Sequence, residues 1–348
     1  MTSSVAAEPQ RYLETQIAWQ PIEIAFWLAT LAPFVLAPSY LTLASQIAIT
    51  ALFALSLDLI LGYAGIVSLG HAMFFGLGAY TAGLITKPFS TSISLRLFDL
   101  HIPVSSAGWG EPLSGLVIAA IVAGLVGYLT SFIIARFRHL ALIMITLGLG
   151  LLLAEAANSA SWLTGGADGL QGVRMWKLLG MFEFDIFGTT AYAYSLIVLF
   201  LVFLVARRLI HSPFGLALRG IRENATRMPA IGAPSAAHIR KVYTIAAVMA
   251  GIAGALLAQT TETVSLETLG FQRSADVLVM LILGGAGRLY GGLVGAIIYM
   301  VARDQFSGIN PQYWYFWIGA LLVAVVIFLP NGILGGLARL VPARWRAA

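Results

Sequence analysis

A short polar stretch interrupts an otherwise apolar chain: SPFGLALRGIRENATRMPAIGA, residues 212–233. Its first half predicts a helix, because Ser212 suits an N-cap and Pro213 suits the first helical position, where its missing N–H costs nothing. Apolar side chains recur at helical spacing along one face of that helix, at Phe214, Leu218, Ile221 and Ala225. Such an amphipathic helix either lies on lipid or docks into a partner protein, and its short apolar face with one aromatic favours the partner.

The sequence on both sides of this stretch predicts a membrane protein. Of the 348 residues, 59% are hydrophobic and only 10% are charged, whereas soluble domains carry about 25% charged residues. We therefore predict an all-α fold, a polytopic transmembrane helical bundle of about 8–10 spans with glycine-broken or re-entrant segments. The candidate spans are 22–38, 41–62, 64–86, 113–135, 139–158, 191–210, 241–260, 276–302 and 313–330.

The basic residues predict the orientation of these spans. Seven Lys or Arg and one acidic residue lie between Arg207 and Lys241, so we expect this loop to be cytoplasmic. Counting spans from there places both termini in the cytoplasm and the 87–112 and 159–190 loops outside. The net charge of +5 thus reflects loop topology, and no nucleic-acid partner is expected. The first 20 residues lack the apolar core of a signal peptide, so we expect the first span to direct insertion.

A glycine-rich run breaks one of the candidate spans. The sequence GGAGRLYGG, residues 284–292 (the glycine break), carries a charged Arg288 at its centre. A single span over 276–302 would leave the basic tail outside, so we predict two helices or half-helices that meet at this break. Irregular backbone at membrane depth is tolerated only when it is buried in protein or faces a water-filled path. The glycine-rich segment 64–86 is also expected not to cross as a plain helix.

Several polar side chains within the spans are candidates for a translocation path. They are Ser68, His71, Glu155, Asn158 and Arg288. A lone histidine that is hydrogen-bonded to a carbonyl would look the same in sequence. For His71, a role on the path and a structural hydrogen bond therefore both remain open. Charged groups near span ends also reach the interface at little cost, which is the alternative for Glu155, Asn158 and Asp58.

Small residues line two faces of the 241–260 segment. They recur every four residues, at Ala247, Gly251 and Ala255 and at Ala250, Gly254 and Ala258. This spacing lets helix backbones approach closely. Tight packing inside a bundle is one interpretation, and a face that slides during gating is the other.

No motif in the chain predicts catalysis. The glycine break is not a phosphate loop, since no strand precedes it and no Gly-Lys-Ser/Thr follows it. The sequence also contains no HExxH, nucleophile elbow or carboxylate cluster, and its lack of cysteine excludes disulfides and thiolate metal sites. We therefore expect no enzyme activity, no cofactor and no metal in this chain.

The polar stretch resembles the cytoplasmic coupling loop of ATP-binding-cassette importer permeases, specifically the branched-chain amino acid permeases of the LivM type. In that family the loop reads close to SPFGRALRAIREN, which SPFGLALRGIREN (212–224) matches. Further matching motifs follow in order along residues 50 to 340: GYAGIVSLGHAMFFGLGAYTAGL (62–84), TGGADGL (164–170), GIAGALLA (251–258), LILGGAGRLYGGLVGA (281–296) and FLPNGILG (328–335).

The resemblance implies a permease subunit of a bacterial inner-membrane importer. Its partners would be a second homologous permease subunit, two cytoplasmic ABC ATPase subunits that use the ATP, a periplasmic substrate-binding protein and membrane lipid. It also implies a domain plan: 1–21 as a cytoplasmic segment, 22–338 as the permease domain with the coupling loop at 212–234, and 339–348 as a basic cytoplasmic tail. The residues carried over to ATPase coupling are Pro213, Phe214, Leu218, Arg219, Arg222, Glu223 and Gly232. Pro229 departs from the family pattern, so we expect it to end the helix and to limit the contact to 213–228.

The substrate class follows only from the resemblance. The LivM type implies leucine, isoleucine or valine, but relatives carry urea, short amides or aromatic acids. The SLGHA motif around His71 favours the amino acid branch over the urea branch. An ion-coupled secondary transporter is the alternative from another class, and it would favour paired carboxylates or a charged relay, which the sequence lacks.

Overall fold

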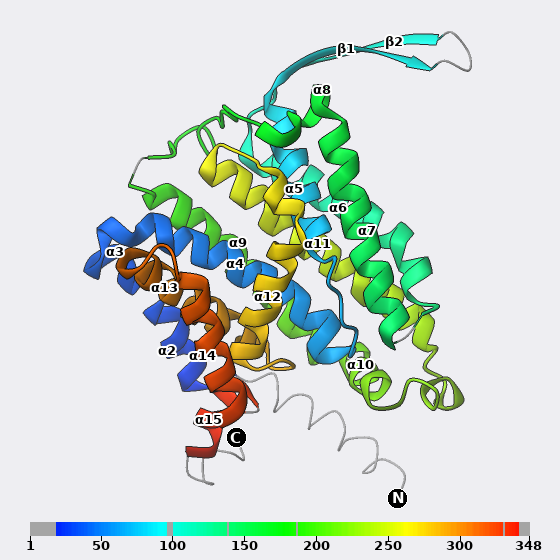
Figure 1. Ribbon diagram of the computed structural model, residues 1–348, viewed down its shortest axis with the longest axis vertical. Helices are drawn as coiled ribbons and strands as arrows, with labels where there is room; N and C mark the ends of the chain where they lie inside the picture. The colour runs from blue at the N-terminus through cyan, green and yellow to red at the C-terminus, as the bar shows by residue number, and fades with distance from the viewer. Residues whose placement is uncertain (1–18, 96–99, 138, 186, 330, 341–348) are drawn as a thin grey trace, which may run out of the picture. The chain divides into compact units, whose positions relative to one another are not determined.

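The computed structural model describes residues 19–95, 100–137, 139–185, 187–329 and 331–340 (Figure 1). Most of the predicted N-terminal segment and of the basic tail, 1–18 and 341–348, lies outside the described residues. The chain divides into two compact units, each assembled from separate stretches of sequence. The first comprises Met1–Val67, Tyr192–Val242 and Asp276–Ala348, and the second comprises Ser68–Ala191 and Tyr243–Ala275.

Apolar helices dominate the described part of the chain, which confirms the prediction of a polytopic helical protein. Within that part, six helices are long and apolar enough to cross a membrane, or up to seven if a bent pair counts as one. The six are α4 with η1 before it and η2 after it (together Pro38–Tyr63), α6 (Pro112–Ile134), α7 (His139–Ser159), α9 (Thr189–Ile210), α11 (Ser235–Thr261) and α14 with α15 (Trp314–Gly336 within them).

Two of the candidate spans, 22–38 and 64–86, contain only short helices. The segment 22–38 forms two separate helices, α2 (Pro21–Ala29) and α3 (Ala32–Leu36). They are separate because Pro33 cannot donate a backbone hydrogen bond to α2 and lies instead in the first turn of α3. The segment 64–86 is helical only in α5 (Ala72–Thr86). Its first residues are irregular, and Gly65 has a φ of +71°, which residues other than glycine rarely adopt. The irregular start of 64–86 confirms the expectation that this segment is not a plain helix.

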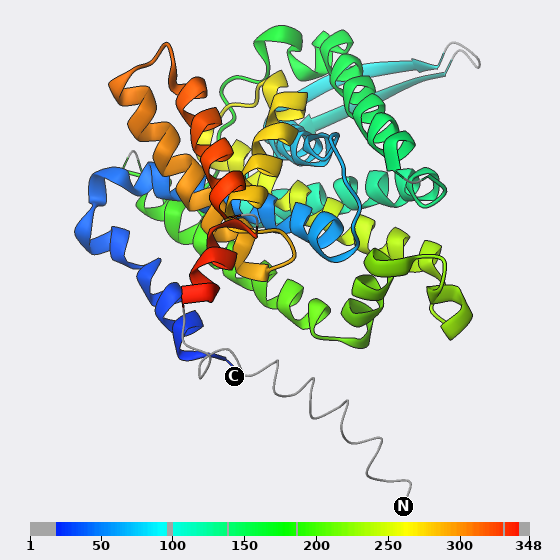
Figure 2. The same ribbon diagram turned by 60° about the horizontal axis from the view of Figure 1, so that its bottom comes forward.

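The glycine break separates α12 (Phe271–Gly284) from α13 (Leu289–Ile309), as predicted from the sequence, and the two helices meet at 112°. Glycines allow them to touch: a Cβ at Gly284 would lie 1.8 Å from the Gly291 carbonyl oxygen, and one at Gly295 would lie 1.8 Å from that of Met280. Beyond α13 the chain turns into α14 (Trp314–Phe328), which lies beside it in Figure 2, and ends in α15 (Gly332–Leu340).

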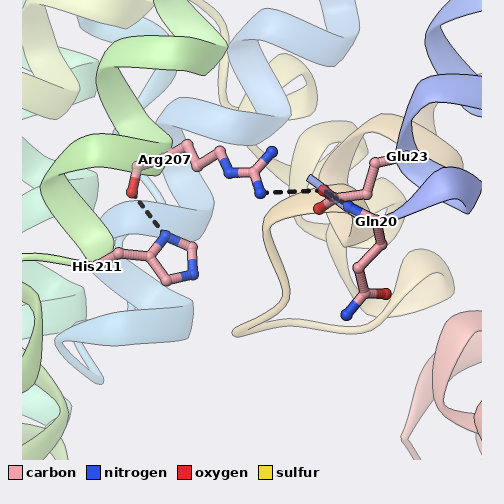
Figure 3. Close-up of polar contacts among 4 residues, drawn as sticks. All are labelled: Gln20, Glu23, Arg207 and His211. Atoms are coloured by element: carbon pink, nitrogen blue, oxygen red, sulfur yellow. Dashed lines mark hydrogen bonds and ion pairs between the residues drawn. The ribbon is translucent and has the colours of Figure 1, made fainter. Parts of the chain in front are cut away.

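A buried ion pair joins α2 to the last turn of α9 (Figure 3). The Arg207 guanidinium lies 3.0 Å from the Glu23 carboxylate, and both side chains are largely buried. The Trp19 ring covers the guanidinium at 4.1 Å from its centroid. The Arg207 carbonyl oxygen also contacts the His211 Nδ1 at 2.8 Å. The sequence marked Arg207 only as a basic residue of a loop, whereas the structure uses it to hold the N-terminal helix.

In the second unit, the small residues of α11 lie in close helix contacts. All six are buried, and a Cβ at Gly254 would lie 1.8 Å from the Phe75 carbonyl oxygen of α5. A Cβ at Gly251 would similarly lie 2.4 Å from the Ala123 Cβ of α6. This geometry confirms the interpretation as tight packing.

The connection between α5 and α6 contains the two strands of the described chain, β1 (Pro88–Leu95) and β2 (Leu100–Ala107). They pair antiparallel, with Pro88 opposite Ala107 and Leu95 opposite Leu100 (Figure 1). This hairpin lies in the 87–112 loop and is an addition to the predicted helical architecture. A second long connection is fixed by an antiparallel bridge between Leu170 and Val264.

Candidate functional site

Helix α10 (Pro213–Asn224) forms where the polar stretch predicts a helix. Ser212 occupies the N-cap position with extended backbone, and Pro213 lies in the first turn. The Ser212 hydroxyl does not cap the helix, however, because it donates to the Leu209 carbonyl oxygen at 2.6 Å. The prediction was therefore right about the start of the helix and wrong about the capping bond.

One face of α10 is buried against its own chain. Leu218 is 0% exposed and Ile221 is 4% exposed. Phe214 is half-buried and stacks on His238, with ring centroids 5.4 Å apart. Burying apolar side chains of this size stabilises a docked helix by about 1.5–3 kcal/mol each. Leu218 therefore holds α10 in place and leaves no surface for a partner, which corrects its predicted role as an ATPase anchor.

The other face of α10 is exposed and charged. Arg219 and Glu223 are both exposed, and the Arg219 guanidinium lies 5.4 Å from the centroid of the Tyr63 ring. Leu216 lies on the same side of the helix as Arg219 and Glu223 and is 42% exposed. The sequence analysis did not select Leu216, and its place off the buried stripe was the available signal. We name Leu216, Arg219 and Glu223 the exposed face of α10.

The end of α10 is set by Asn224 and not by Pro229. The Asn224 side-chain oxygen accepts hydrogen bonds from the Thr226 hydroxyl at 2.6 Å and from the Arg227 backbone N–H at 3.2 Å, which turns the chain. Pro229 lies beyond this turn, in the short 3₁₀ helix η4 (Met228–Ile231). Gly232 follows with a φ of +88° and no atom near its missing side chain. Its conformation, rather than crowding, requires glycine there.

Arg222 binds within the chain although its position on α10 is exposed. Its guanidinium donates to the Gly62 carbonyl oxygen in the π-helix η2 (Leu59–Tyr63). Its aliphatic stem covers Gly65, where a Cβ would lie 3.0 Å from the Arg222 Cγ. Arg222 thus connects α10 to the end of α4 (Leu41–Asp58). Arg222 thus has a contact within its own chain, and its predicted contact with a partner stays a prediction.

Asp58 is the residue that sequence reasoning missed. We expected it to reach the interface near the end of its span, but it is 0% exposed. Its Oδ1 accepts a hydrogen bond from the Gly287 backbone N–H at 2.7 Å, and its Oδ2 has no hydrogen-bond partner among the described residues. An acidic residue inside the apolar run LSLDLIL was the available signal. Only the tertiary structure shows that this carboxylate contacts the glycine break.

Ser68 and His71 lie in the irregular segment before α5 and are both buried. The backbone of this segment is held by side chains, since Thr146 Oγ1 accepts from the Leu69 N–H at 3.3 Å and Ser274 Oγ accepts from the Ala72 N–H at 2.9 Å. The His71 ring packs edge-on against Phe74, with centroids 5.7 Å apart. Both residues are therefore enclosed in protein, and their role on a path stays a prediction.

The other three candidates for the path are exposed. Glu155 and Asn158 lie on the outer surface of α7, where Glu155 accepts a weak hydrogen bond from the Ser159 hydroxyl at 3.4 Å. Arg288 begins α13 and places its guanidinium beside Gly335. These three residues are therefore exposed, whereas Ser68 and His71 are buried, and a shared role of the five on a path stays a prediction.

An apolar cavity of about 310 Å³ lies within the first unit, between α2, α4, α9 and α13. No charged side chain is among its lining residues. The two hydroxyls that line it are engaged, because Thr30 donates to the Trp27 carbonyl oxygen and Tyr192 donates to that of Thr30. A zwitterion loses its hydration in such a space without replacement, so this cavity is unsuited to hold a free amino acid.

Comparison with known proteins identifies the family. The family model described as branched-chain amino acid transport system / permease component matches residues 39–326. The LivM permease protein of the high-affinity branched-chain amino acid transport system is 27% identical in both Salmonella typhimurium and Escherichia coli, over 88% of this chain and 72% of the relative. The LivH permease protein of that system in Escherichia coli is 25% identical, over 82% of this chain and 91% of the relative. No solved structure matches the chain.

Proposed function

Since the chain belongs to the family of branched-chain amino acid transport permease components, we propose that it is the substrate-translocating subunit of a bacterial ATP-driven importer for branched-chain amino acids. The family match over 39–326 carries this proposal, because it includes both the apolar helices and α10. The relatives are named as permease proteins of a branched-chain amino acid transport system, which supports the substrate class.

We infer that ATP is hydrolysed by separate partner subunits. The sequence holds no nucleotide-binding motif, so the energy must come from another chain if transport is ATP-driven. The exposed face of α10 combines one apolar side chain with a cation and an anion, which suits a protein surface better than lipid. Two cytoplasmic ABC ATPase subunits would dock there, and their closure would move α10 together with α9 and α11, which flank it in the chain.

The remaining partners follow from the same proposal. Both LivM and LivH resemble this chain, which supports pairing with a second homologous permease. A periplasmic binding protein would deliver the substrate and contribute most of its selection. The protein would lie in the inner membrane with both termini in the cytoplasm, as the seven basic residues between Arg207 and Lys241 predict.

Uptake of labelled leucine by cells that express the complete transporter tests this function. We expect uptake to collapse when the nucleotide site of the partner ATPase is inactivated, and to survive a protonophore under conditions that preserve ATP. The reverse pattern would contradict the proposal and favour an ion-coupled transporter. Competition by excess urea, a short amide or phenylalanine, each tested against valine, identifies which substrate branch the transporter serves.

A further inference from the structure

The contacts around Asp58 form a continuous link from α10 to the glycine break. Arg222 on α10 donates to the Gly62 carbonyl oxygen, and Asp58 one turn before Gly62 accepts from the Gly287 N–H. The backbones of Gly62 and Gly287 also touch, since a Cβ at Gly62 would lie 2.4 Å from the Gly287 nitrogen and 2.0 Å from the Asp58 Oδ1. We name these four residues, Asp58, Gly62, Arg222 and Gly287, the latch.

The latch is costly to maintain, which argues that it serves more than packing. A fully buried carboxylate loses its hydration, and Asp58 regains only one hydrogen bond among the described residues. The Arg222 guanidinium lies beside the same glycines, since it donates to the Gly62 carbonyl oxygen and a Cβ at Gly287 would lie 2.9 Å from its Nη1, so its positive charge offsets part of that loss. A shift of α10 that withdraws Arg222 would therefore also weaken the hydrogen bond between the Asp58 carboxylate and the Gly287 N–H.

The elements joined by the latch are ones that can change conformation. Gly62 lies in a π-helix. This form is rare in proteins, and where it occurs it is often at a functional site. Gly287 has a φ of +79° within a break where two helices meet at 112°. The other side of this break rests on Gly332 at the start of α15, where a Cβ would lie 2.5 Å from the Gly285 Cα. Glycines thus bring backbone against backbone on both sides of the break, at Gly62 and Gly287 and at Gly285 and Gly332.

We propose that the latch transmits the movement of α10 to the glycine break, with Asp58 as the positioning residue that holds the break until Arg222 moves. This inference rests on the proposed function, because it takes the partner ATPase as the source of the movement. When α10 shifts, the Gly62 carbonyl oxygen and the Asp58 carboxylate shift with it, the Gly287 hydrogen bond breaks, and α12 and α13 are free to change their angle.

The absence of cysteine from the chain allows a direct test in the complete transporter in lipid nanodiscs. In an Ala286→Cys variant the single thiol lies at an exposed position of the break and reports its accessibility to a water-soluble maleimide. Gln312→Cys, exposed in the turn between α13 and α14, is the matched control. We expect ATP with vanadate to change the labelling rate at 286 by about tenfold, the middle of the range for coupling between sites, and to leave 312 unchanged.

Three substitutions separate the latch from a purely structural role. Asp58→Ala and Arg222→Met are each expected to make labelling at 286 independent of nucleotide and to lower leucine uptake about tenfold, while the complex assembles and hydrolyses ATP. Asp58→Asn keeps an acceptor for the Gly287 N–H and is expected to restore the nucleotide response. Arg222→Met keeps the stem over Gly65 at an exposed position, so it provides the test even if Asp58→Ala does not fold.

The outcomes are distinguishable from failure of the proposed function. If the unsubstituted complex takes up no leucine in response to ATP, the function itself is wrong. If that complex transports leucine and Asp58→Ala and Arg222→Met retain both uptake and the nucleotide response, the latch is wrong. Loss of assembly in both variants would also contradict it, because the contacts would then serve only the fold.

Discussion

Arg222 and Glu223 are neighbours in the sequence with different surroundings in the structure. Arg222 donates to the Gly62 carbonyl oxygen of its own chain, whereas Glu223 is exposed and has no hydrogen-bond or ion-pair partner among the described residues. Their side chains point to different parts of the helix surface because adjacent residues on a helix are about 100° apart. At the scale of single residues, the two therefore have separate expected effects.

Removing Glu223 should affect the partner contact and not the fold. We expect Glu223→Ala, alone and with Arg219→Ala, to lower co-purification of the ATPase and leucine uptake, while thermal unfolding stays within about 0.5 kcal/mol of the parent, as is usual for surface changes. Glu183→Ala, which removes the same side chain from the exposed segment before α9, is the control and should change neither. Unchanged uptake in the double variant would remove the exposed face of α10 from the coupling.

Gly62 offers a second prediction at this scale. Any side chain there would overlap the Asp58 carboxylate and the Gly287 backbone, so Gly62→Ala should destabilise the protein by about 1–3 kcal/mol, as overpacking does. Gly319→Ala in α14 is the matched control, since no atom lies within 4 Å of its missing Cβ. It should raise stability by up to about 1 kcal/mol through helix propensity. Equal melting temperatures for the two variants would show that the close approach at Gly62 is wrong.

At the scale of elements, periodicity and breaker residues predicted most of the described helices. The amphipathic pattern of α10, the break between α12 and α13 and the small-residue faces of α11 were all visible in sequence, because each depends on neighbours within a few turns. The burial of Asp58 and the pairing of Arg207 with Glu23 were not visible. Both depend on contacts between residues more than 180 positions apart, about which local patterns carry no information.

The ion pair between α2 and α9 gives a prediction for element docking. Arg207 and Glu23 are largely buried, so Glu23→Gln should destabilise the protein by up to about 3–5 kcal/mol by leaving a buried charge without its counter-ion. The pair Lys177 and Glu183 is the control, because both side chains are mostly exposed and Lys177→Ala should cost at most about 1 kcal/mol. Thermal unfolding in detergent measures both, and equal shifts would contradict the burial of the α2 pair.

The turn after α10 gives another prediction at the scale of elements. Gly232→Val places a β-branched residue at a φ of +88°, and we expect it to disturb the start of α11 and to weaken transport. Gly232→Asn should be tolerated, since asparagine adopts this conformation and nothing crowds the position. Leucine uptake and melting temperature of the two variants provide the comparison, and equal damage from both would show that conformation is not the cause.

At the scale of the whole molecule, the chain is a multi-pass member of a permease family and acts, in our proposal, only with its partners. We expect the chain reconstituted alone in liposomes to give no leucine uptake with ATP on either side. Adding the second permease, the ATPase subunits and the binding protein should restore it. ATP-independent accumulation by the chain alone would contradict the division of labour.

The most direct test of the central claim, that α10 is where the ATPase docks, is cross-linking from that helix. Leu216→Cys provides the only thiol in the chain and carries a benzophenone maleimide on the exposed face of α10. Illumination of the transporting complex should give an adduct with the ATPase subunit, and the same label at Gln312→Cys should give none. A complex that transports leucine but forms no ATPase adduct from position 216 would contradict the claim.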